Sequence, residues 1–526
     1  MRLNIFGLPR RQPRHRDISL DEDETQGMLV DENQSSPKPN VQGKLSKAKI
    51  VAFFTASIDL ARRLLLVLAP SFLTETELQE ASSTSQDHHL STSSLDGLRG
   101  YAALAVMNYH ILYAYQSFVF YGYGLSQAAS KSCARPEDVY AHNRWFHQLP
   151  VFRMAYGGTW PISAFFVISG FALSHRPLKV SRDAADGFTS GASAVASGLF
   201  RRAFRLYGPP LIATFITMVL IQLGAYEHGR KVSGDTNWVP VINEAHHKRF
   251  DSFGLQLGDW LHETWKMFHV FWWGDLHNQY DVHLWTIPTE FRCSLAIFLV
   301  LPMYISLRVR VRRVVMVLLI IFVYKLDRWD VALFYSGLLI ADTSIDWQQR
   351  LKKSLDGTAA GVSSAMVKST ILALSLLLLS APDFCISETP AYRILSSLIP
   401  SSDPAPFRFI PNLGGIILVA LVAHTAPSNL LVATLLTSSI PQYLGRISYS
   451  LYIVHGPLIH TIGYWLFPTM WNLTGHEEPW RYVIGFLAAY GTFLAVAVIV
   501  ADLFWRAIDS PSVRFAKAVH GKVMRE

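Results

Sequence analysis

Two side chains that can carry charge stand in the first long apolar run of the chain. Arg99 and His110 are eleven residues apart, a spacing of about 20° beyond three full helical turns and about 16 Å of rise. On an α-helix both lie on one stripe, the arginine at the membrane surface and the imidazole near mid-bilayer. Ionisable side chains inside a span are costly and by default mark function. His110 taken alone also fits a neutral imidazole bonded to a neighbouring helix.

A second group of polar side chains lies in the apolar run 284–306. Glu290 and Arg292 are two residues apart, so they point in different directions on a helix and each needs another partner. His283 comes directly before the run. A carboxylate and an imidazole at this depth are the parts of a proton-transfer site.

The apolar run 445–467 adds two more imidazoles. Ser448 and His455 are seven residues apart and share a helical face, and His460 follows. Histidines and a carboxylate at similar depth suit general acid–base catalysis, and they equally suit a proton-coupled transporter. These residues alone leave both interpretations open.

The composition explains why such residues stand out. Half of the 526 residues are hydrophobic, only 16% are charged and the mean hydropathy is +0.23, whereas a soluble protein carries about 25% charged residues. The chain therefore belongs in lipid, and a collagen-like, fully disordered or disulfide-stapled protein is excluded. The net charge of +8 fits basic loops at an anionic membrane surface and needs no nucleic acid.

The apolar runs predict an all-α polytopic membrane protein with about ten transmembrane helices, because a helix crosses a bilayer in about 20 residues. The runs are 98–121, 157–176, 203–225, 284–306, 312–325, 330–345, 368–386, 409–427, 445–467 and 482–505.

The polar segments around these runs predict the domain organisation. Residues 1–49 are expected to form a disordered cytosolic tail. Residues 50–93 are expected to form an amphipathic interfacial helix and a linker, because the polar residues of 50–69 gather on one helical face. The transmembrane domain covers 94–516, and 517–526 form a second cytosolic tail.

The distribution of basic residues predicts the orientation. With the N-terminal tail in the cytosol, the connections on that side hold 20 Lys and Arg in 95 positions, about twice the density of the other side. The glycosylation sequon that begins at Asn472 falls on the other side, where the modification takes place. Both termini are therefore expected in the cytosol, in an endomembrane (ER or Golgi) or in the plasma membrane.

Three cysteines are too few for a disulfide framework or a CxxC metal site. One bridge between Cys133 and Cys385 stays open, with Cys293 left over. The segment 246–251 has the His–His–x–x–x–Asp pattern of soluble condensation-type acyltransferases, but Ser252 stands where those families want Gly. We interpret it as a solvated loop, and its histidines lack the closed ligand set of a zinc site.

Six segments, in order along the chain, resemble the membrane-bound acyltransferase-3 family over about residues 94–516. The first-helix signature of that family is an Arg, ten residues and a His, which Arg99 and His110 match. The segments are Ser94–Leu104, Phe165–Phe171, Arg201–Leu206 with Pro209, Trp285–Phe291, Gly445–His455 and Ile508–Arg514. Their structural motif positions are Asp96, Ser169 and Ser448. The chain looks closest to fungal members, many of which resemble O-acetyltransferases of secondary metabolites.

The resemblance implies transfer of an acyl group, usually acetyl, from cytosolic acyl-CoA to a hydroxyl of a small-molecule, glycan or secondary-metabolite acceptor. His110 would be the general base, and either Glu290 or His455 would assist it. Neither a bound cofactor nor a metal is implied. Loops 122–156 and 226–282 would shape the acceptor pocket, and they carry no recognisable motif. The residues implied for acyl-CoA binding are Arg99, Arg201, Arg202 and Arg205.

A proton-coupled or acyl-group transporter is the rival interpretation. Transporter halves usually carry internal repeats, and residues 98–345 and 368–505 show none. A catalytically inactive scaffold would lack Arg99 or His110, and both are present. For the arginines of 201–205, an ordinary positive-inside anchor is the alternative to acyl-CoA binding.

Overall fold

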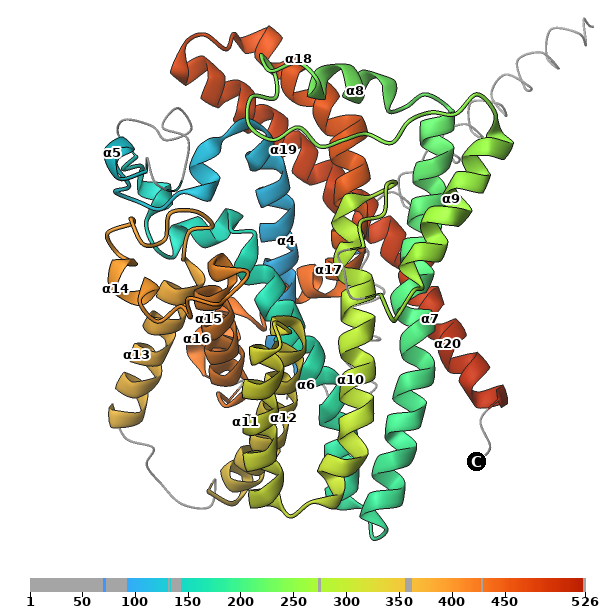
Figure 1. The fold of residues 1–526 in the computed structure, drawn as a ribbon, viewed down its shortest axis with the longest axis vertical. Coiled ribbons are helices and arrows are strands. Elements are labelled where there is room, and N and C mark those ends of the chain that lie inside the picture. Colours follow the sequence, from blue (N-terminus) through green and yellow to red (C-terminus); the bar gives the residue numbers. More distant parts are fainter. Residues whose placement is uncertain are drawn as a thin grey trace, which may run out of the picture. The chain divides into compact units, whose positions relative to one another are not determined.

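The computed structural model describes residues 70–71, 92–130, 133, 143–272, 276–354, 362–426 and 429–523. In this part of the chain the secondary structure is helical and contains no strand, which confirms the all-α fold class (Figure 1). The tail expected at 1–49 lies outside the described residues, and so does nearly all of the segment 50–93.

Each of the ten apolar runs overlaps a helix or consecutive helical segments. Among the described residues, the stretches long and apolar enough to cross a membrane are Gly187–Gln222, Val282–Ser306, Pro406–Ala423 and Pro479–Val523. The total of ten spans stays a prediction. The long helices are α4 (Ser93–Tyr115), α6 (Thr159–Asp183), α7 (Gly187–Gln222), α9 (Phe253–Met267), α10 (Thr286–Ser306), α11 (Val309–Lys325), α12 (Trp329–Ser354), α13 (Val362–Leu379), α15 (Pro406–Ala423), α17 (Ser439–Leu458), α18 (Tyr464–Thr474), α19 (Pro479–Phe504) and α20 (Ser510–Val523).

Shorter helical segments connect the long helices. The α-helical ones are α5 (Gln127–Ser130), α8 (Glu227–Ser233), α14 (Arg393–Ser396) and α16 (Leu430–Leu435). The 3-10 turns are η2 (Ser117–Phe120), η4 (Phe146–Gln148), η5 (Phe152–Tyr156) and η6 (Val282–Trp285). Two π-helical turns, η7 (Ile459–Gly463) and η8 (Trp505–Asp509), interrupt the C-terminal helices.

Several predicted boundaries differ from the structure, and two of them concern the runs that carry His110 and His455. α4 ends at Tyr115 because Gln116 is extended, so the first span stops before residue 121. The run 445–467 is not one helix, since the π turn η7 separates α17 from α18. Pro457 lacks the N–H that a regular helix needs, which favours an interruption there.

α4 and α17 touch each other at their glycines. A Cβ atom added at Gly100 would lie 2.6 Å from the backbone nitrogen of Gly445, and one added at Gly445 would lie 2.3 Å from the carbonyl oxygen of Asp96. Both distances are shorter than a real Cβ contact, so only residues without a side chain permit this spacing. The contact fixes the height of His110 on α4 relative to His455 on α17.

α4 also contributes to two separate hydrophobic clusters. Met107 and Ile111 belong to one cluster, which takes in side chains of α17, α18 and α19. Leu98 and Ala102 belong to the other, which takes in side chains of α6, α10 and α12. The helix that carries His110 is therefore packed on more than one side by protein.

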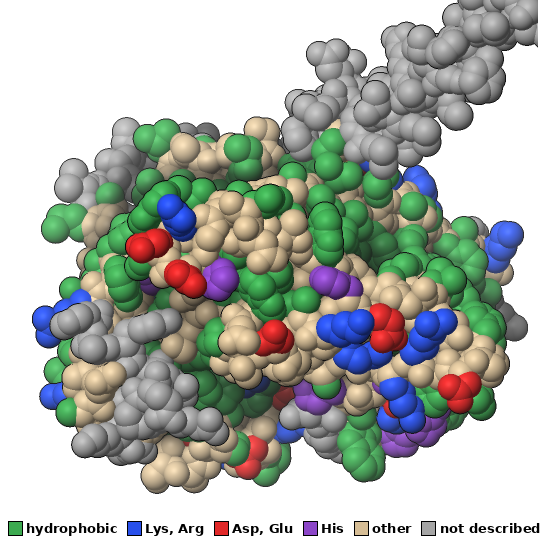
Figure 2. Space-filling view, turned by 90° about the horizontal axis from the view of Figure 1, so that it is seen from above, with side chains coloured by type: hydrophobic (Ala, Val, Ile, Leu, Met, Phe, Trp, Pro, Cys, Tyr) green, Lys and Arg blue, Asp and Glu red, His purple; other side chains and the backbone are tan. Residues whose placement is uncertain are grey.

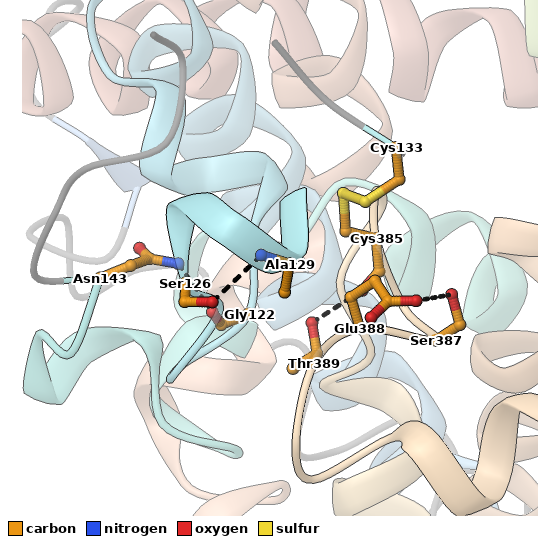
Figure 3. Close-up of a disulfide and its surroundings, with 9 residues drawn as sticks. All are labelled: Gly122, Ser126, Ala129, Cys133, Asn143, Cys385, Ser387, Glu388 and Thr389. Carbon is orange, nitrogen blue, oxygen red and sulfur yellow. Dashed lines mark hydrogen bonds between the residues drawn. A yellow bond between two sulfur atoms is a disulfide. The ribbon is translucent and has the colours of Figure 1, made fainter. Parts of the chain in front are cut away.

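One end of the molecule carries α5, α8 and α18, at the top of Figure 1. Seen from above, that face presents acidic, basic and histidine side chains (Figure 2). A disulfide joins Cys133, which follows α5, to Cys385, which follows α13 (Figure 3). The bridge that the sequence leaves open is therefore formed, and Cys293 is free and buried.

Candidate active site

Three imidazoles from three elements meet beside the C-terminal part of α4. His110 comes from α4, His283 from η6 and His455 from α17, and the ring nitrogens that they offer lie within 4.8 Å of one another. The ring centroid of His110 is 4.1 Å from that of His283 and 5.2 Å from that of His455. Histidines from three segments that are far apart in the sequence thus form one cluster.

The carboxylate of this cluster is Glu244, which lies in the connection between α8 and α9. Its Oε1 accepts a hydrogen bond of 2.8 Å from His283 Nε2, and its Oε2 accepts one of 2.6 Å from His460 Nε2. The same Oε1 lies 3.8 Å from His110 Nδ1. Glu244 is therefore the anion that links His110 to two other imidazoles.

Glu244 is buried and yet ionised at neutral pH. Its side chain is only 8% exposed, and burial alone would raise the pKa of this carboxyl. The charge of His283 and the hydrogen bonds from His283 and His460 act in the opposite direction, and they hold the pKa of Glu244 well below its usual range. The cluster thus contains a fixed negative charge close to His110.

A chain of histidines continues from Glu244 into the connection before α9. His460 Nδ1 lies 2.9 Å from His246 Nε2. Burial, followed by the charges of His460 and Arg230, lowers the pKa of His246 to about 3, so this ring is neutral at pH 7. The interpretation of 246–251 as a solvated loop is therefore wrong at its start, where His246 packs against the π turn η7.

His283 is held between two carboxylates. Its Nδ1 lies 2.8 Å from Asp281 Oδ1, and its Nε2 donates to Glu244. Because ionised carboxylates only accept, both ring nitrogens donate and the imidazole carries a positive charge. α17 allows this arrangement through Gly456, where an added Cβ would lie 2.5 Å from His283 Nδ1. The Tyr452 hydroxyl donates to the His283 carbonyl oxygen.

His455 is fixed in one tautomer by the backbone of its own helix. Its Nδ1 donates to the carbonyl oxygen of Tyr452 across 2.7 Å, so Nε2 of the neutral ring is an acceptor. Nε2 of His455 and Nδ1 of His110 are buried and have no hydrogen-bond partner among the described residues. Such atoms are rare in folded proteins, and the Nδ1 of His110 faces the Glu244 carboxylate at 3.8 Å.

A metal ion is another group that three clustered imidazoles could hold. Metal-bound histidines usually donate their second N–H to a carboxylate or a backbone carbonyl, as His283 does to Asp281 and His455 to Tyr452. His283 Nε2, however, already donates to Glu244, and a metal ligand must be deprotonated. The hydrogen bonds of His283 therefore favour proton transfer over metal binding.

A cavity of about 300 Å³ adjoins His110, and we call it the histidine cavity. The side chain of His110 is 21% exposed, so a molecule in this cavity can reach the imidazole. Besides His110 and His283, the lining includes the aromatic or charged residues Tyr109, Trp285, Phe384, Phe407, Asp383 and Arg408.

A second cavity of about 350 Å³ lies toward the start of α4, and we call it the arginine cavity. Ile162, Thr286 and Tyr452 line both cavities and therefore separate them. The Thr286 and Tyr452 hydroxyl oxygens are 2.6 Å apart and hydrogen-bonded. The charged residues that line the arginine cavity are Asp96, Arg99, Arg176, Arg202, Arg205 and Glu290.

Glu290 belongs to the arginine cavity and not to the histidine cluster. Its Oε1 accepts hydrogen bonds from Arg202 Nη2 across 2.7 Å and from Ser169 Oγ across 2.6 Å. Arg292 donates instead to Thr289 Oγ1 across 3.0 Å. Glu290 and Arg292 thus have separate partners, as their spacing predicts. The carboxylate beside His110 is Glu244.

The predicted acyl-CoA arginines are divided between cavities. Arg99 lies 3.5 Å from the Asp96 carboxylate, one turn away on α4. Arg201 donates to a backbone carbonyl of its own helix and lines a neighbouring cavity rather than the arginine cavity. Ser448, the motif serine of α17, donates to the Gly445 carbonyl oxygen and lines the arginine cavity. Of the four arginines predicted to bind acyl-CoA, Arg99, Arg202 and Arg205 line the arginine cavity.

Sequence reasoning missed Glu244 and Asp281. Both lie in the segment 226–282, in which no motif is recognisable. Asp281 could have been found from its spacing, because a carboxylate two residues before a histidine can accept from the backbone N–H of that histidine, as it does for His283. Glu244 had no comparable signal, since only the packing of its loop against η6 and η7 brings it to His110.

Comparison with known proteins agrees with this site. The acyltransferase-3 family model, described as an acyltransferase domain, matches residues 92–505. The matched region contains the three imidazoles and Glu244. It ends before α20.

Curated relatives cover most of the chain. The O-acetyltransferase PaAT-1 of Phomopsis amygdali is 28% identical over 470 residues, which are 83% of this chain and 86% of the relative. The acyltransferase R4 of a Phoma species is 23% identical over 464 residues, 80% of this chain and 94% of the relative. The acyltransferase clz18 of Cochliobolus lunatus is 24% identical over 455 residues, which are also 80% of this chain and 94% of the relative. No solved structure matches the chain.

Proposed function

This chain belongs to the acyltransferase-3 family and is an acyltransferase, and we propose that it moves an acyl group, in the first place acetyl, from acyl-CoA to a hydroxyl group within the membrane. The observation that carries the proposal is the pairing of His110 with the buried carboxylate of Glu244, at the wall of a cavity. The name of the Phomopsis relative, an O-acetyltransferase, supports acetyl as the group and oxygen as the acceptor atom.

In the proposed reaction His110 is the general base. The imidazole takes the proton from the acceptor hydroxyl while its oxygen attacks the thioester carbonyl carbon. The tetrahedral adduct collapses as the carbon–sulfur bond breaks, and the CoA thiolate receives the proton from His110. The products are an ester and CoA thiol, with no proton gained or lost. Glu244 stabilises the imidazolium between the two steps, as a carboxylate does for a catalytic histidine in other enzymes.

We assign the donor to the arginine cavity. Arg99 and Arg205 line it on the same side of the molecule as the start of α4, and arginine suits phosphate groups because its fork of donors matches their geometry. Arg202 is paired with Glu290, so its charge is already balanced and we give it a positioning role. The thioester would then meet His110 at the boundary formed by Thr286 and Tyr452.

We assign the acceptor to the histidine cavity. Aromatic rings such as Tyr109, Trp285 and Phe407 line it, and its volume of about 300 Å³ is at the lower end for ligand pockets. An aromatic lining with few charges favours an apolar alcohol, such as a secondary metabolite, over a glycan. Asp383 and Arg408 are the charged residues that could orient a second polar group of the acceptor.

The orientation belongs to the same proposal. Disulfides persist in oxidising compartments, so the Cys133–Cys385 bridge supports a non-cytosolic location for its end of the molecule. The basic connections expected in the cytosol lie in other loops. We therefore keep both termini in the cytosol, in an endomembrane or the plasma membrane, with the histidine cavity nearer to the disulfide side.

The proposal is tested by acyl transfer in detergent. The purified protein is given acetyl-CoA and a panel of apolar alcohols, and thiol release and ester formation are followed together. His110→Ala should lower kcat by about 10²–10⁴-fold, the usual contribution of a general base. Treatment with a metal chelator should leave the rate unchanged, because a general base uses an imidazole nitrogen that is not bound to a metal ion.

The matched control is His262→Ala, an exposed histidine on α9, which should keep the wild-type rate. Equal rates for wild type and His110→Ala would refute His110 as the base. Loss of activity on chelation, restored by a divalent metal, would replace the base with a metal site. Turnover in micelles also separates an enzyme from a transporter, since transport needs a sealed membrane.

A further inference from the structure

A third cavity, of about 310 Å³, lies between α20 and the starts of α4 and α17, and we call it the α20 cavity. Cationic side chains predominate in its lining, and Asp509 is the carboxylate among the described residues that line it. The charged lining residues are Arg99, Arg205, Arg446, Asp509, Arg514 and Lys517. A cavity with this excess of positive charge is suited to a polyanion.

One face of α20 forms a wall of this cavity. Ser510, Val513, Arg514 and Lys517 line it, at the spacings of three, four and seven residues that share a helical face. The opposite side of the helix packs on α7 through Phe515, whose ring centroid is 6.0 Å from that of a phenylalanine there. α20 is thereby held with its cationic face toward the cavity.

The α20 cavity adjoins the arginine cavity. Arg99, Arg205, Ser448 and Tyr449 line both. The arginine cavity in turn reaches the boundary with the histidine cavity, and Arg99 is about 16 Å of helix away from His110. A long donor with its thioester at His110 would therefore extend through the arginine cavity and place its far end at α20.

We infer that Arg514 and Lys517 of α20 bind the phosphate groups at the nucleotide end of the acyl-CoA donor. The inference rests on the proposed function, which supplies a donor with phosphates at one end and a thioester at the other. α20 lies beyond residue 505, where the family match ends, although Arg514 closes the last of the segments that resemble the family. Charge-assisted hydrogen bonds from guanidinium and ammonium groups to phosphate are strong and suit this task.

Anionic lipid headgroups carry the same phosphate chemistry, and basic residues near a membrane often meet them. The position of Arg514 and Lys517 favours the donor, because both line a cavity together with Arg99 and Arg205. The experiment must nevertheless separate the two sources of phosphate.

The test compares acetyl-CoA with S-acetyl-pantetheine, which has the thioester but no nucleotide. In the full-length protein, Arg514→Ala combined with Lys517→Ala should raise KM for acetyl-CoA by about tenfold or more, the loss expected for contacts to a charged group. The kcat value and the KM for acetyl-pantetheine should stay at wild-type levels. Arg514→Lys keeps a positive charge at this position, so its KM for acetyl-CoA should lie between that of the wild type and that of the alanine variant. Lys522→Ala, which removes a charge from the same helix but not from the cavity, should behave as wild type.

The same variants are measured in nanodiscs of phosphatidylcholine with and without phosphatidylserine, and their affinity for CoA itself is measured by equilibrium dialysis. An unchanged KM for acetyl-CoA, or equal changes for both donors, would overturn the inference. A changed response to phosphatidylserine with an unchanged donor KM would assign these residues to lipid. If CoA binding depends on Arg514 and Lys517 but the protein transfers no acyl group, the inference would stand and the proposed function would be refuted.

Discussion

His110 owes its position and its electrostatic surroundings to residues from other segments. Its Nδ1 faces the Glu244 carboxylate at 3.8 Å, and Glu244 in turn is fixed by hydrogen bonds from His283 and His460. Asp281 holds the far nitrogen of His283. A carboxylate fixed in this way can stabilise an imidazolium when it forms without having to move, which is how a preorganised site assists catalysis.

At this scale we predict that Glu244→Gln lowers kcat by up to about 10⁴-fold, the loss seen when the carboxylate beside a catalytic histidine is replaced by a neutral amide. Glutamine keeps the shape but removes the charge, so protonated His110 loses its nearest anion. The acidic limb of the pH–rate profile, where the base becomes protonated, should therefore move to lower pH. Steady-state rates between pH 5 and 9 check both effects.

Glu477→Gln is the matched control, because Glu477 is an exposed carboxylate between α18 and α19 and lies outside the histidine cluster. It should leave both kcat and the pH profile unchanged. A Glu244→Gln enzyme with a wild-type profile would show that the carboxylate has no part in proton transfer.

The height of His110 relative to His455 is set by the contact between their two helices. Gly100 of α4 and Gly445 of α17 allow the two backbones to touch, and this contact sets His110 level with His455. The π turns also carry residues of these sites: His460 of η7 donates to Glu244, and Asp509 of η8 lines the α20 cavity. π turns within helices occur frequently at functional sites.

For these elements we predict that Gly445→Ala separates α4 from α17. The new Cβ would lie 2.3 Å from the Asp96 carbonyl oxygen. Because that oxygen belongs to the backbone, it cannot move away as the end of a flexible side chain could. Overpacking of this kind costs about 1–3 kcal/mol, so the thermal midpoint in detergent should fall. The kcat value should fall as well, because His110 and His455 move apart.

Gly491→Ala on α19 serves as the comparison, since nothing lies within 4 Å of the added Cβ. Alanine has the higher helix propensity, so this variant should be as stable as wild type or slightly more so. Equal stability and activity for Gly445→Ala and Gly491→Ala would contradict the close contact of α4 and α17.

At the scale of the whole molecule, cavities of different character lie in sequence along it. The histidine cavity and the arginine cavity meet at Thr286 and Tyr452, and the α20 cavity continues from the arginine cavity. The disulfide lies between loops near the histidine cavity, since Phe384 lines that cavity and Cys385 forms the bridge. A donor and an acceptor approaching from opposite ends would meet at His110.

For the whole molecule we predict a glycan and a disulfide on the same side of the membrane. Asn472 is exposed at the end of α18, so endoglycosidase treatment of the protein from a eukaryotic host should increase its gel mobility. Asn472→Gln should abolish that shift. Peptide mapping without reductant should recover Cys133 linked to Cys385, and Cys133→Ser should lower the thermal midpoint because the link restricts the unfolded chain. If Asn472 carries no glycan and Cys133 is not linked to Cys385, the proposed orientation is contradicted.

The all-α class, the resemblance to the acyltransferase family and several candidate site residues could be predicted from the sequence alone. Apolar runs fix helices because a bilayer leaves the backbone no other partner for its hydrogen bonds. Charges inside such runs are rare enough to be recognised one by one, which is why Arg99, His110, His283 and His455 could be named. Their spacing along single helices also placed each of them on a face.

Only the tertiary structure decided which side chains act together. Glu290 was one of two candidates, with His455, to assist His110, but it pairs with Arg202 in another cavity. Glu244 stands in a polar connection with no pattern, and its role arises from how that connection folds against η6 and η7. Helical periodicity relates residues of one segment to one another, whereas contacts between distant segments depend on packing that no local pattern encodes.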